Sequence, residues 1–369
     1  MPMLINKYYF LLYLFVGVIA VSCTSKNEKE KFEREFSFDR NLVNTEAAEV
    51  VCELSEDSVL LKEIFDFTIL NDTSFVAMDG RGAYLYHISG AFKKQFGNFG
   101  QAGGEMISPS LVYATSNYVY IWCTSLMKFL IFDHEANLKN ELSGFNKAVK
   151  KFAVNPSDEI MYLYTSGFLD ESENKVYNVV EVYDIAKKTS KKFGERGAED
   201  EILSSYRNTG GLHVDSDRFI YLHPANLIIH DFDLNSDKTV RYKINDKAFH
   251  TTKITSPVRD IMGDNNLWTD YFCQNSLVKG LYKDSDQYII SSEIGKFYTS
   301  EQSRLRDNKK NERKVKLYIF DSSFNPDRTI LFDYIASSNI VVYSDYLYFI
   351  TLMDSDEQIF SLKRFSLLK

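Results

Sequence analysis

One mark recurs along this 369-residue chain and constrains its fold more than any other feature: an alternating apolar segment ends in an aromatic residue, usually followed by aspartate and a turn. The marked aromatics are Tyr86, Phe132, Tyr183, Phe232, Phe320 and Phe365. Successive marks are separated by 46, 51, 49, 88 and 45 residues. Repeats of this length, each with several short strands, are typical of propeller blades, which bury their apolar faces only by stacking on neighbours. The repeat therefore predicts an all-β propeller.

Each repeat divides into four short strands separated by turn residues. In the second repeat the predicted strands are 110–114, 118–124, 128–133 and 137–142. In the fourth repeat they are 211–214, 218–222, 226–232 and 238–244. A second repeated motif supports this register. The pentapeptide FGNFG at 96–100 is similar to FGERG at 193–197, and the two are 97 residues apart, which is the length of two blades.

The 88-residue interval allows two interpretations: a hidden seventh blade, or one blade with long insertions. Residues 276–281 and 287–293 have the pattern of the first two strands of a blade, and residues 315–321 and 328–332 that of the last two. The run between them, 299–313, is polar and rich in Lys and Arg, so it cannot be a core strand. We therefore predict a six-bladed β-propeller with an insertion-bearing fifth blade.

The sixth repeat shows only three clear strands, at 340–343, 346–352 and 358–365. Residues 49–54 have a strand pattern and could supply the missing outer strand. Such a pairing would join the two ends of the domain and leave no free sheet edge across the join. The predicted propeller domain accordingly spans residues 49–369.

Residues 96–105, FGNFGQAGGE, resemble a turn of the six-bladed β-propeller lipoproteins of Bacteroidota, often described as TolB-like or NHL-like. Members carry a Phe-Gly pair, then a Gly-Gln-Gly-Pro-Gly-Glu-like turn, and a strand that ends in Phe-Asp. Here Gly103 replaces the proline, and the turn returns in degraded form at 197–201. The resemblance implies the propeller fold over about residues 50–369. It implies no catalytic residue, and the function of most members is unknown.

The N-terminus has the pattern of an export signal. Lys7 precedes 14 apolar residues, 8–21, and the charged stretch 24–30 follows Cys23 directly. Ending at cysteine makes residues 1–22 resemble a bacterial lipoprotein signal, which implies that the Cys23 thiol is lipidated. An ordinary cleaved signal and a retained anchor are the alternatives, although the apolar run is short for a membrane span, which needs about 20 residues. Residues 23–48 are predicted to be a flexible tether.

Composition limits the partners. Removing residues 1–22 takes away Lys7 and no acid, so the formal charge moves from −8 to −9, and nucleic acid is not an expected partner. We expect attachment to the membrane through the lipid, in the bacterial envelope at the outer membrane facing the periplasm. Cys52, Cys123 and Cys273 are too widely spaced for a disulfide framework or zinc ribbon, and Cys123 is predicted to be a buried thiol.

No catalytic motif is present in the sequence. The six histidines form no ligand-spaced cluster, and there is no Gly-x-Ser-x-Gly elbow or P-loop. His213, on a predicted inner strand, could line the channel or be a hydrogen-bonded core residue. The sequence thus predicts no catalytic residue, metal or cofactor. It favours a non-catalytic binding or scaffolding module, with a metal-dependent hydrolase or lactonase holding an ion in the channel as the alternative.

The loops at the propeller mouth are the expected binding surface, with a protein or glycan as the partner. The connection 245–274 is about thirty residues long, and long connections inside compact domains are usually functional or disordered. Its aromatic rings would serve recognition, or else pack the insertion onto the blades. By location, the predicted binding residues are Phe99, Gln101, Arg196, Arg207, Trp268 and Tyr271.

Overall fold

The computed structural model describes residues 32–44, 46–54, 61, 63–173, 175–205, 209–215, 218–236, 238–254, 256–295, 314–332, 339–354 and 359–368. The chain divides into two units, Met1–Glu33 and Arg34–Lys369, and the account below concerns the second. The signal segment, Cys23, Arg207 and the polar run 299–313 lie outside the described residues. Among the described residues, no helix is both long and apolar enough to span a bilayer.

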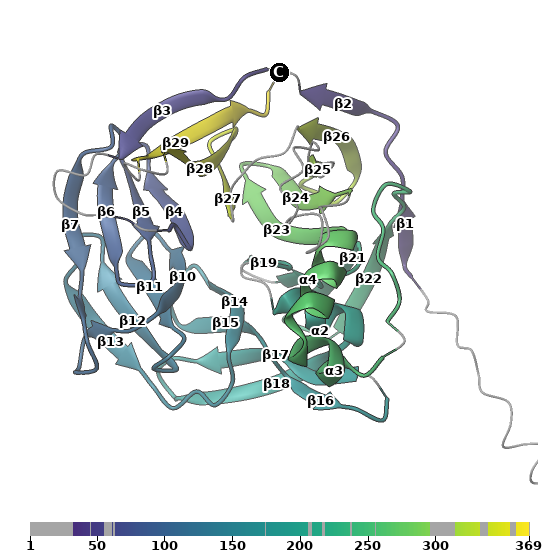
Figure 1. The fold of residues 1–369 in the computed structure, drawn as a ribbon, viewed down its shortest axis with the longest axis horizontal. Coiled ribbons are helices and arrows are strands. Elements are labelled where there is room, and N and C mark those ends of the chain that lie inside the picture. Colours follow the sequence, from purple (N-terminus) through teal and green to yellow (C-terminus); the bar gives the residue numbers. More distant parts are fainter. Residues whose placement is uncertain are drawn as a thin grey trace, which may run out of the picture. The chain divides into compact units, whose positions relative to one another are not determined.

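The described residues of the second unit form six blades around a central axis (Figure 1), which confirms the predicted fold class. Blade 1 consists of β4 (Asp66–Asn71), β5 (Ser74–Met78), β6 (Ala83–His87) and β7 (Phe92–Phe96). Blade 2 consists of β10 (Pro109–Ala114), β11 (Tyr118–Cys123), β12 (Lys128–Asp133) and β13 (Leu138–Leu142). Blade 3 consists of β14 (Val149–Val154), β15 (Ile160–Thr165), β17 (Lys175–Asp184) and β18 (Thr189–Gly197), with β16 (Phe168–Asp170) paired to β17.

Blades 4 to 6 complete the ring. Blade 4 consists of β19 (Gly211–Val214), β20 (Arg218–Leu222), β21 (Ile228–Asp233) and β22 (Lys238–Ile244). Blade 5 consists of β23 (Leu277–Asp284), β24 (Gln287–Ile294), β25 (Lys314–Asp321) and β26 (Pro326–Phe332). Blade 6 consists of β27 (Ile340–Tyr343), β28 (Tyr346–Asp354) and β29 (Ile359–Ser366) with β3 (Glu49–Leu54). The recurring aromatic marks all lie in the third strand of their blade. The 88-residue interval belongs to an insertion-bearing fifth blade, as predicted.

Hydrophobic clusters hold the ring together, and each is shared by two neighbouring blades. Between blades 1 and 2, for example, Phe96 meets Phe132 edge-on, with ring centroids 5.5 Å apart. A cluster of buried apolar residues shared by two blades also lies at each of the other five junctions. Burial of apolar area at these junctions is the main stabilising term, because each blade alone would leave both its faces in water. Cys52, Cys123 and Cys273 are buried and form no disulfide among the described residues, which confirms the predicted role of Cys123.

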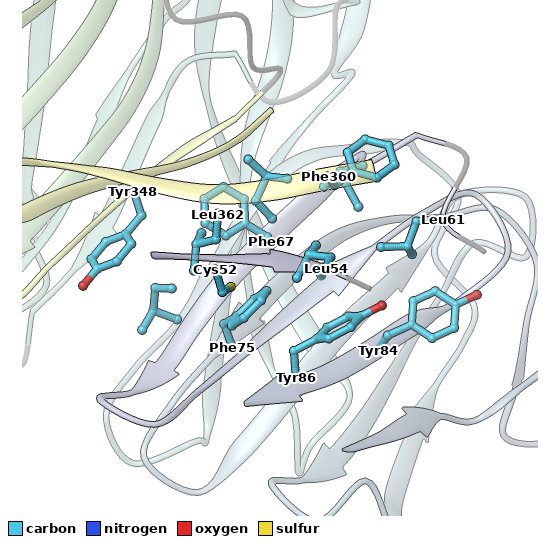
Figure 2. Packing of buried hydrophobic residues seen from close by; sticks show 14 residues of the cluster. Cys52, Leu54, Leu61, Phe67, Phe75, Tyr84, Tyr86, Tyr348, Phe360 and Leu362 are labelled. Carbon is cyan, nitrogen blue, oxygen red and sulfur yellow. The ribbon is translucent and has the colours of Figure 1, made fainter. Parts of the chain in front are cut away.

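The ring closes where the N-terminal strand β3 pairs antiparallel with the C-terminal strand β29, as predicted. Figure 2 shows the core at this junction, where Leu54 of β3 and Leu362 of β29 pack against Phe67 and Phe75 of blade 1. Outside the core, the Arg364 guanidinium donates two hydrogen bonds to the Glu49 carboxylate, Nε–Oε2 at 2.8 Å and Nη2–Oε1 at 3.1 Å. Two segments more than three hundred residues apart in sequence therefore form one blade.

Part of the predicted tether is ordered, which corrects the expectation for residues 34–44. Two strands, β1 (Arg34–Phe36) and β2 (Asn41–Asn44), pair in parallel with the outer strands β22 and β26 of blades 4 and 5. Phe36 is buried between the rings of Tyr242 and Phe320. The outer strands would otherwise expose unpaired backbone N–H and C=O groups, and this N-terminal belt, residues 34–44, covers them.

Three helices occur among the described residues, α2 (Ala198–Ser204), α3 (Val258–Gly263) and α4 (Asn265–Gln274), and they pack together on one end of the ring (Figure 1). The last two occupy the connection 245–274, which was expected to be a loop. Asp264 begins α4 by accepting hydrogen bonds from the backbone N–H groups of Asn266 and Leu267. We call these three helices the helical cap.

Candidate binding site at the mouth of the propeller

The inner strands begin at the end of the ring that carries the helical cap, and we call this end the mouth. A cavity of about 520 Å³ opens there over blades 1 to 3, with α2 as one wall. It is lined by Phe65, Gly80, Ser108, Pro109, Ser110, Leu111, Thr124, Ser125, Ala148, Val149, Lys150, Ser204 and Ser205. Hydroxyl groups dominate its polar lining, and Lys150 is the one charged residue among the described residues that form it. This volume is within the range of small-molecule sites.

Backbone irregularities place polar side chains at the mouth. The pairing of β10 with β11 skips Ser110, and the pairing of β14 with β15 skips Lys150 at the corresponding point of the next blade. Lys279 is skipped in the same way in blade 5. Such bulges leave one residue out of the ladder and redirect its side chain. Ser110 and Lys150 line the mouth cavity, whereas the Lys279 ammonium is buried 3.5 Å from Glu293.

Lys150 is half-buried, and its amine makes no hydrogen bond or ion pair with any residue that the structure describes. Burial lowers the pKa of Lys150, Glu201 partly opposes this change, and Arg196 adds to it. A lysine in this state lacks both the full hydration of the surface and the compensation of a bound acid. Its ammonium is therefore ready to bind a negatively charged or strongly polar group.

Buried polar contacts fix the α2 wall of the cavity. The Arg196 guanidinium is fully buried and donates to Glu201, with Nε–Oε2 at 2.9 Å, and lies 4.9 Å from the centre of the Tyr164 ring. Asp200 accepts from the backbone N–H of Ala225 at 2.7 Å, and burial raises the pKa of Asp200 to about 7. These contacts tie α2 to blades 3 and 4. The serines at its end therefore keep one position in the cavity wall.

The cap reaches the cavity through Trp268. Its indole Nε1 donates to the Oγ of Ser205 at 2.6 Å, and the Ser205 hydroxyl itself donates to the carbonyl of Ile202 at 2.5 Å. Tyr271 donates to the carbonyl of Thr252 at 2.8 Å and packs among the apolar residues of the cap. Both rings hold the helical cap in place, which is the packing alternative considered above. Trp268 also orients a residue of the cavity wall.

A polar layer lies in the central channel, in a cavity that shares Leu111 with the mouth cavity. The channel cavity there has a volume of about 150 Å³ and is lined by inner-strand residues of all six blades. Lys151 of blade 3 reaches the inner strands of blades 4 and 5, where it donates to the carbonyls of Gly210 at 2.8 Å and Lys279 at 2.6 Å. Asp66 of blade 1 accepts from the backbone N–H groups of Phe67 and Val112, at 3.0 and 2.9 Å, and from the amide of Asn339.

Titration of this polar layer predicts a pH dependence of stability. Burial raises the pKa of Asp66 from 3.8 to about 7 and lowers that of Lys151 from 10.5 to about 7. Between pH 4 and 7 the folded Asp66 retains a proton that the unfolded chain releases, so its contribution to the free energy of unfolding falls as pH rises. Between pH 7 and 10 the unfolded Lys151 retains a proton that the folded state has lost, so its contribution rises.

Urea unfolding of the wild type and of Asp66→Asn and Lys151→Met at pH 5, 7 and 9 measures these contributions. The free energy of unfolding of the wild type, relative to that of Asp66→Asn, should be higher at pH 5 than at pH 7. The free energy of unfolding of the wild type, relative to that of Lys151→Met, should be higher at pH 9 than at pH 7. Differences that stay constant with pH would contradict the assignment.

The channel does not fit the metal-dependent alternative. Asp66 is the one carboxylate among the described residues that line the channel cavity, and its oxygens already accept three N–H groups. The Lys151 ammonium in the same cavity would repel a divalent cation. The described part of the chain also contains no cluster of three His, Cys, Asp or Glu residues with the spacing of a metal site. The donor set thus lacks the carboxylates that a divalent ion requires.

The predicted binding residues that the structure describes, Phe99, Gln101, Arg196, Trp268 and Tyr271, do not line the mouth cavity. Phe99, in the short strand β8 (Asn98–Phe99), is 60% exposed, and Gln101 lies in the exposed turn between β8 and β9 (Glu105–Met106). Arg196, Trp268 and Tyr271 support the wall and the cap. His213 contacts Asp215 at 3.1 Å, which agrees with a hydrogen-bonded histidine and not with a channel-lining one.

Sequence reasoning missed Ser108, Ser110, Lys150, Ser204 and Ser205, which line the cavity. One signal was present: Ser110 is the first residue of a predicted inner strand, and inner strands begin at the mouth. The corresponding position of the next blade is Lys150. Aligning the repeats on their inner strands, and not on their aromatic marks, would have led to both residues.

Fold and site together define the chain as a six-bladed β-propeller with a helical cap beside a polar mouth cavity. No family model and no curated protein matches the sequence. Among solved structures, it is similar to a candidate exported protein from Bacteroides fragilis, with a TM-score of 0.59, 12% identity, and 90% of this chain and 98% of that one covered. It is also similar to a DUF4221 family member from Bacteroides vulgatus, with a TM-score of 0.62, 10% identity, and coverage of 87% and 98%. At these identities the likeness shows the fold alone.

Proposed function

We propose that the mature protein is a lipid-anchored, non-catalytic binding or scaffolding module of the bacterial envelope, and that its ligand or partner binds in the mouth cavity. The observation that carries the proposal is the cavity itself: about 520 Å³, lined by hydroxyls and one lysine, at the end of a rigid ring. Binding sites of folded domains are commonly preformed hollows with a few polar groups on an apolar wall. Phe65, Leu111 and Val149 provide that wall here.

The lining favours binding over catalysis. Among the described residues that form it, there is no carboxylate, imidazole or thiol. Lysine can activate a serine in some hydrolases, but a nucleophile must then lie within hydrogen-bond distance of the base. The hydrogen bonds of Ser110, Ser204 and Ser205 go instead to Thr124, Glu201 and Ile202.

Anchoring and location rest on the N-terminal sequence. Cys23 ends an apolar run directly before a charged stretch, the pattern of a lipoprotein signal. A Bacteroides protein of the same fold bears the name of a candidate exported protein, which agrees with an envelope location. We place the lipid in the outer membrane, with the propeller facing the periplasm. More than one acyl chain is needed for stable anchoring, and diacylation of Cys23 would supply it.

One set of variants tests both parts of the proposal in membranes of a Bacteroides host. Metabolic labelling with a palmitate analogue should mark the wild type and leave Cys23→Ala unlabelled. Ser125→Trp places an indole in the mouth cavity from an exposed turn. Material that co-purifies with the detergent-solubilised wild type, identified by native mass spectrometry, should be reduced about tenfold or more with Ser125→Trp, because the ring occupies the ligand volume.

Ser116→Trp is the matched control, since Ser116 is also exposed and lies in the turn before β11, whereas Ser125 lies in the turn after it. It should co-purify with the same material as the wild type. If Ser125→Trp retains everything that the wild type binds, the mouth is not the binding surface. If Cys23→Ala is labelled like the wild type, the anchor is elsewhere.

A further inference from the structure

We propose that the ligand of the mouth cavity carries an anionic oxygen group, a carboxylate or a phosphate, and that the Lys150 amine binds it. The inference rests on the proposed binding function and names the chemistry that the ligand must present. It is argued from the position of Lys150, from the charges around it and from the hydroxyls beside it.

Lys150 is held in the cavity by its backbone. As the bulged residue between Val149 and Lys151, it makes no ladder pair with β15, and the bulge turns its side chain toward the mouth. Lys151 extends the other way into the channel, where two carbonyls fix its amine. Two consecutive lysines therefore serve different purposes: one is fully hydrogen-bonded within the protein, and the other lacks any such partner among the described residues.

The charges around Lys150 do not neutralise it. Glu201 is the acid whose charge acts on Lys150, but it already forms a buried ion pair with Arg196. Asp200 is occupied by the backbone N–H of Ala225 and the amide of Asn226. The described lining of the cavity thus carries one positive charge and no negative one. In a partly desolvated site, an added anion interacts with this ammonium more strongly than it would on an open surface.

The hydroxyls complete the site. Ser108, Ser110, Thr124 and Ser125 lie on the blade 2 side of the cavity. Ser110 and Thr124 share one hydrogen bond, so this pair has one hydroxyl left to donate to a ligand, and Ser108 and Ser125 can donate one hydrogen bond each. Carboxylates and phosphates present several acceptor oxygens, so one oxygen can face Lys150 while others accept from the hydroxyls. Lysine acts as a point charge and suits either geometry. The two ligand sources therefore share one site and need separate probes.

Acylation of lysines provides a direct test on the full-length protein. The rate of Lys150 modification by an N-hydroxysuccinimide acetate reagent is followed by peptide mass spectrometry, alone and with inorganic phosphate or acetate, at constant ionic strength in sodium chloride. A probe at ten times its dissociation constant should slow the labelling of Lys150 about tenfold by mass action. Labelling of Lys147, which lies outside the mouth cavity, should not change. The probe that protects at the lower concentration identifies the anion class.

Variants separate this inference from the proposed function. Lys150→Met should weaken binding of the effective probe about ten- to a hundredfold, whereas Lys147→Met, the charge-matched control, and Lys150→Arg should stay within a few-fold of wild type. Equal melting temperatures of the variants would show that they fold. If neither probe protects Lys150 and Lys150→Met keeps the material that Ser125→Trp loses, the anion inference is wrong and the binding function stands. If Ser125→Trp loses nothing, the binding function itself fails.

Discussion

Replacing Glu201 by alanine is expected to lower the free energy of unfolding by about 3–5 kcal/mol. Glu201 is the carboxylate partner of Arg196, whose guanidinium has no exposed surface. Removal of the acid leaves a buried charge that water cannot reach, and the remaining contact, the Tyr164 ring, compensates only a part of it. Because α2 carries Glu201, the same change should loosen the wall of the mouth cavity. Urea denaturation followed by far-ultraviolet circular dichroism measures the loss.

Two controls identify the buried charge as the cause. Glu195→Ala removes an acid from the same strand as Arg196, but its partner Lys175 is exposed, so we expect a change below about 1 kcal/mol. The double variant Arg196→Met/Glu201→Leu removes both charges and should be more stable than Glu201→Ala alone. A double variant less stable than the single one would show that packing, and not the unpaired guanidinium, dominates.

The second large effect is expected at the closure of the ring. Leu362→Ala should cost about 2–5 kcal/mol, because the side chain is fully buried against the core of blade 1 and its truncation leaves a cavity. Leu362 lies opposite Cys52 in the pairing of β29 with β3, so the loss falls on the junction that joins the chain ends. The same denaturation experiment measures it.

Leu352→Ala is the matched control for this prediction. Leu352 lies on the neighbouring strand β28 but is 48% exposed, so its truncation should change stability by about 0.5 kcal/mol or less. Similar losses for the two variants would mean that the junction does not depend on the core shown in Figure 2.

The blades were predictable because their signal is repeated and local. A half-buried strand alternates along its own sequence, and four strands in every repeat confirm one another. The bounds of β12 and β22 are those predicted, and β3 was assigned to blade 6 from the missing strand there. The N-terminal belt was not predictable from its own residues. Arg34–Phe36 and Asn41–Asn44 are short, mostly polar segments, and they become strands only because the edges of β22 and β26 offer partners.

The site was less accessible to sequence reasoning than the fold. Its general place, the mouth, followed from the architecture, but its residues depend on bulges, and a bulge changes one backbone position without altering the hydrophobic period. Aromatic residues in a long connection were therefore favoured over Lys150. Trp268 illustrates the difference: its ring supports the wall by donating to Ser205, an effect visible only once the cap is folded.

The N-terminal belt also determines how the protein responds to tension. A pull applied at Arg34 acts first on β1, whose pairing covers three residues, and then on β2, whose pairing covers four. The load reaches β3, where Leu54 and Cys52 lie in a core, only after β1 and β2 have separated from the outer strands of blades 4 and 5. We therefore expect the belt to separate from the blades under load before the strand pairing that closes the ring. With the lipid anchor proposed at Cys23, separation of the belt would lengthen the link between membrane and ring and leave the blades paired.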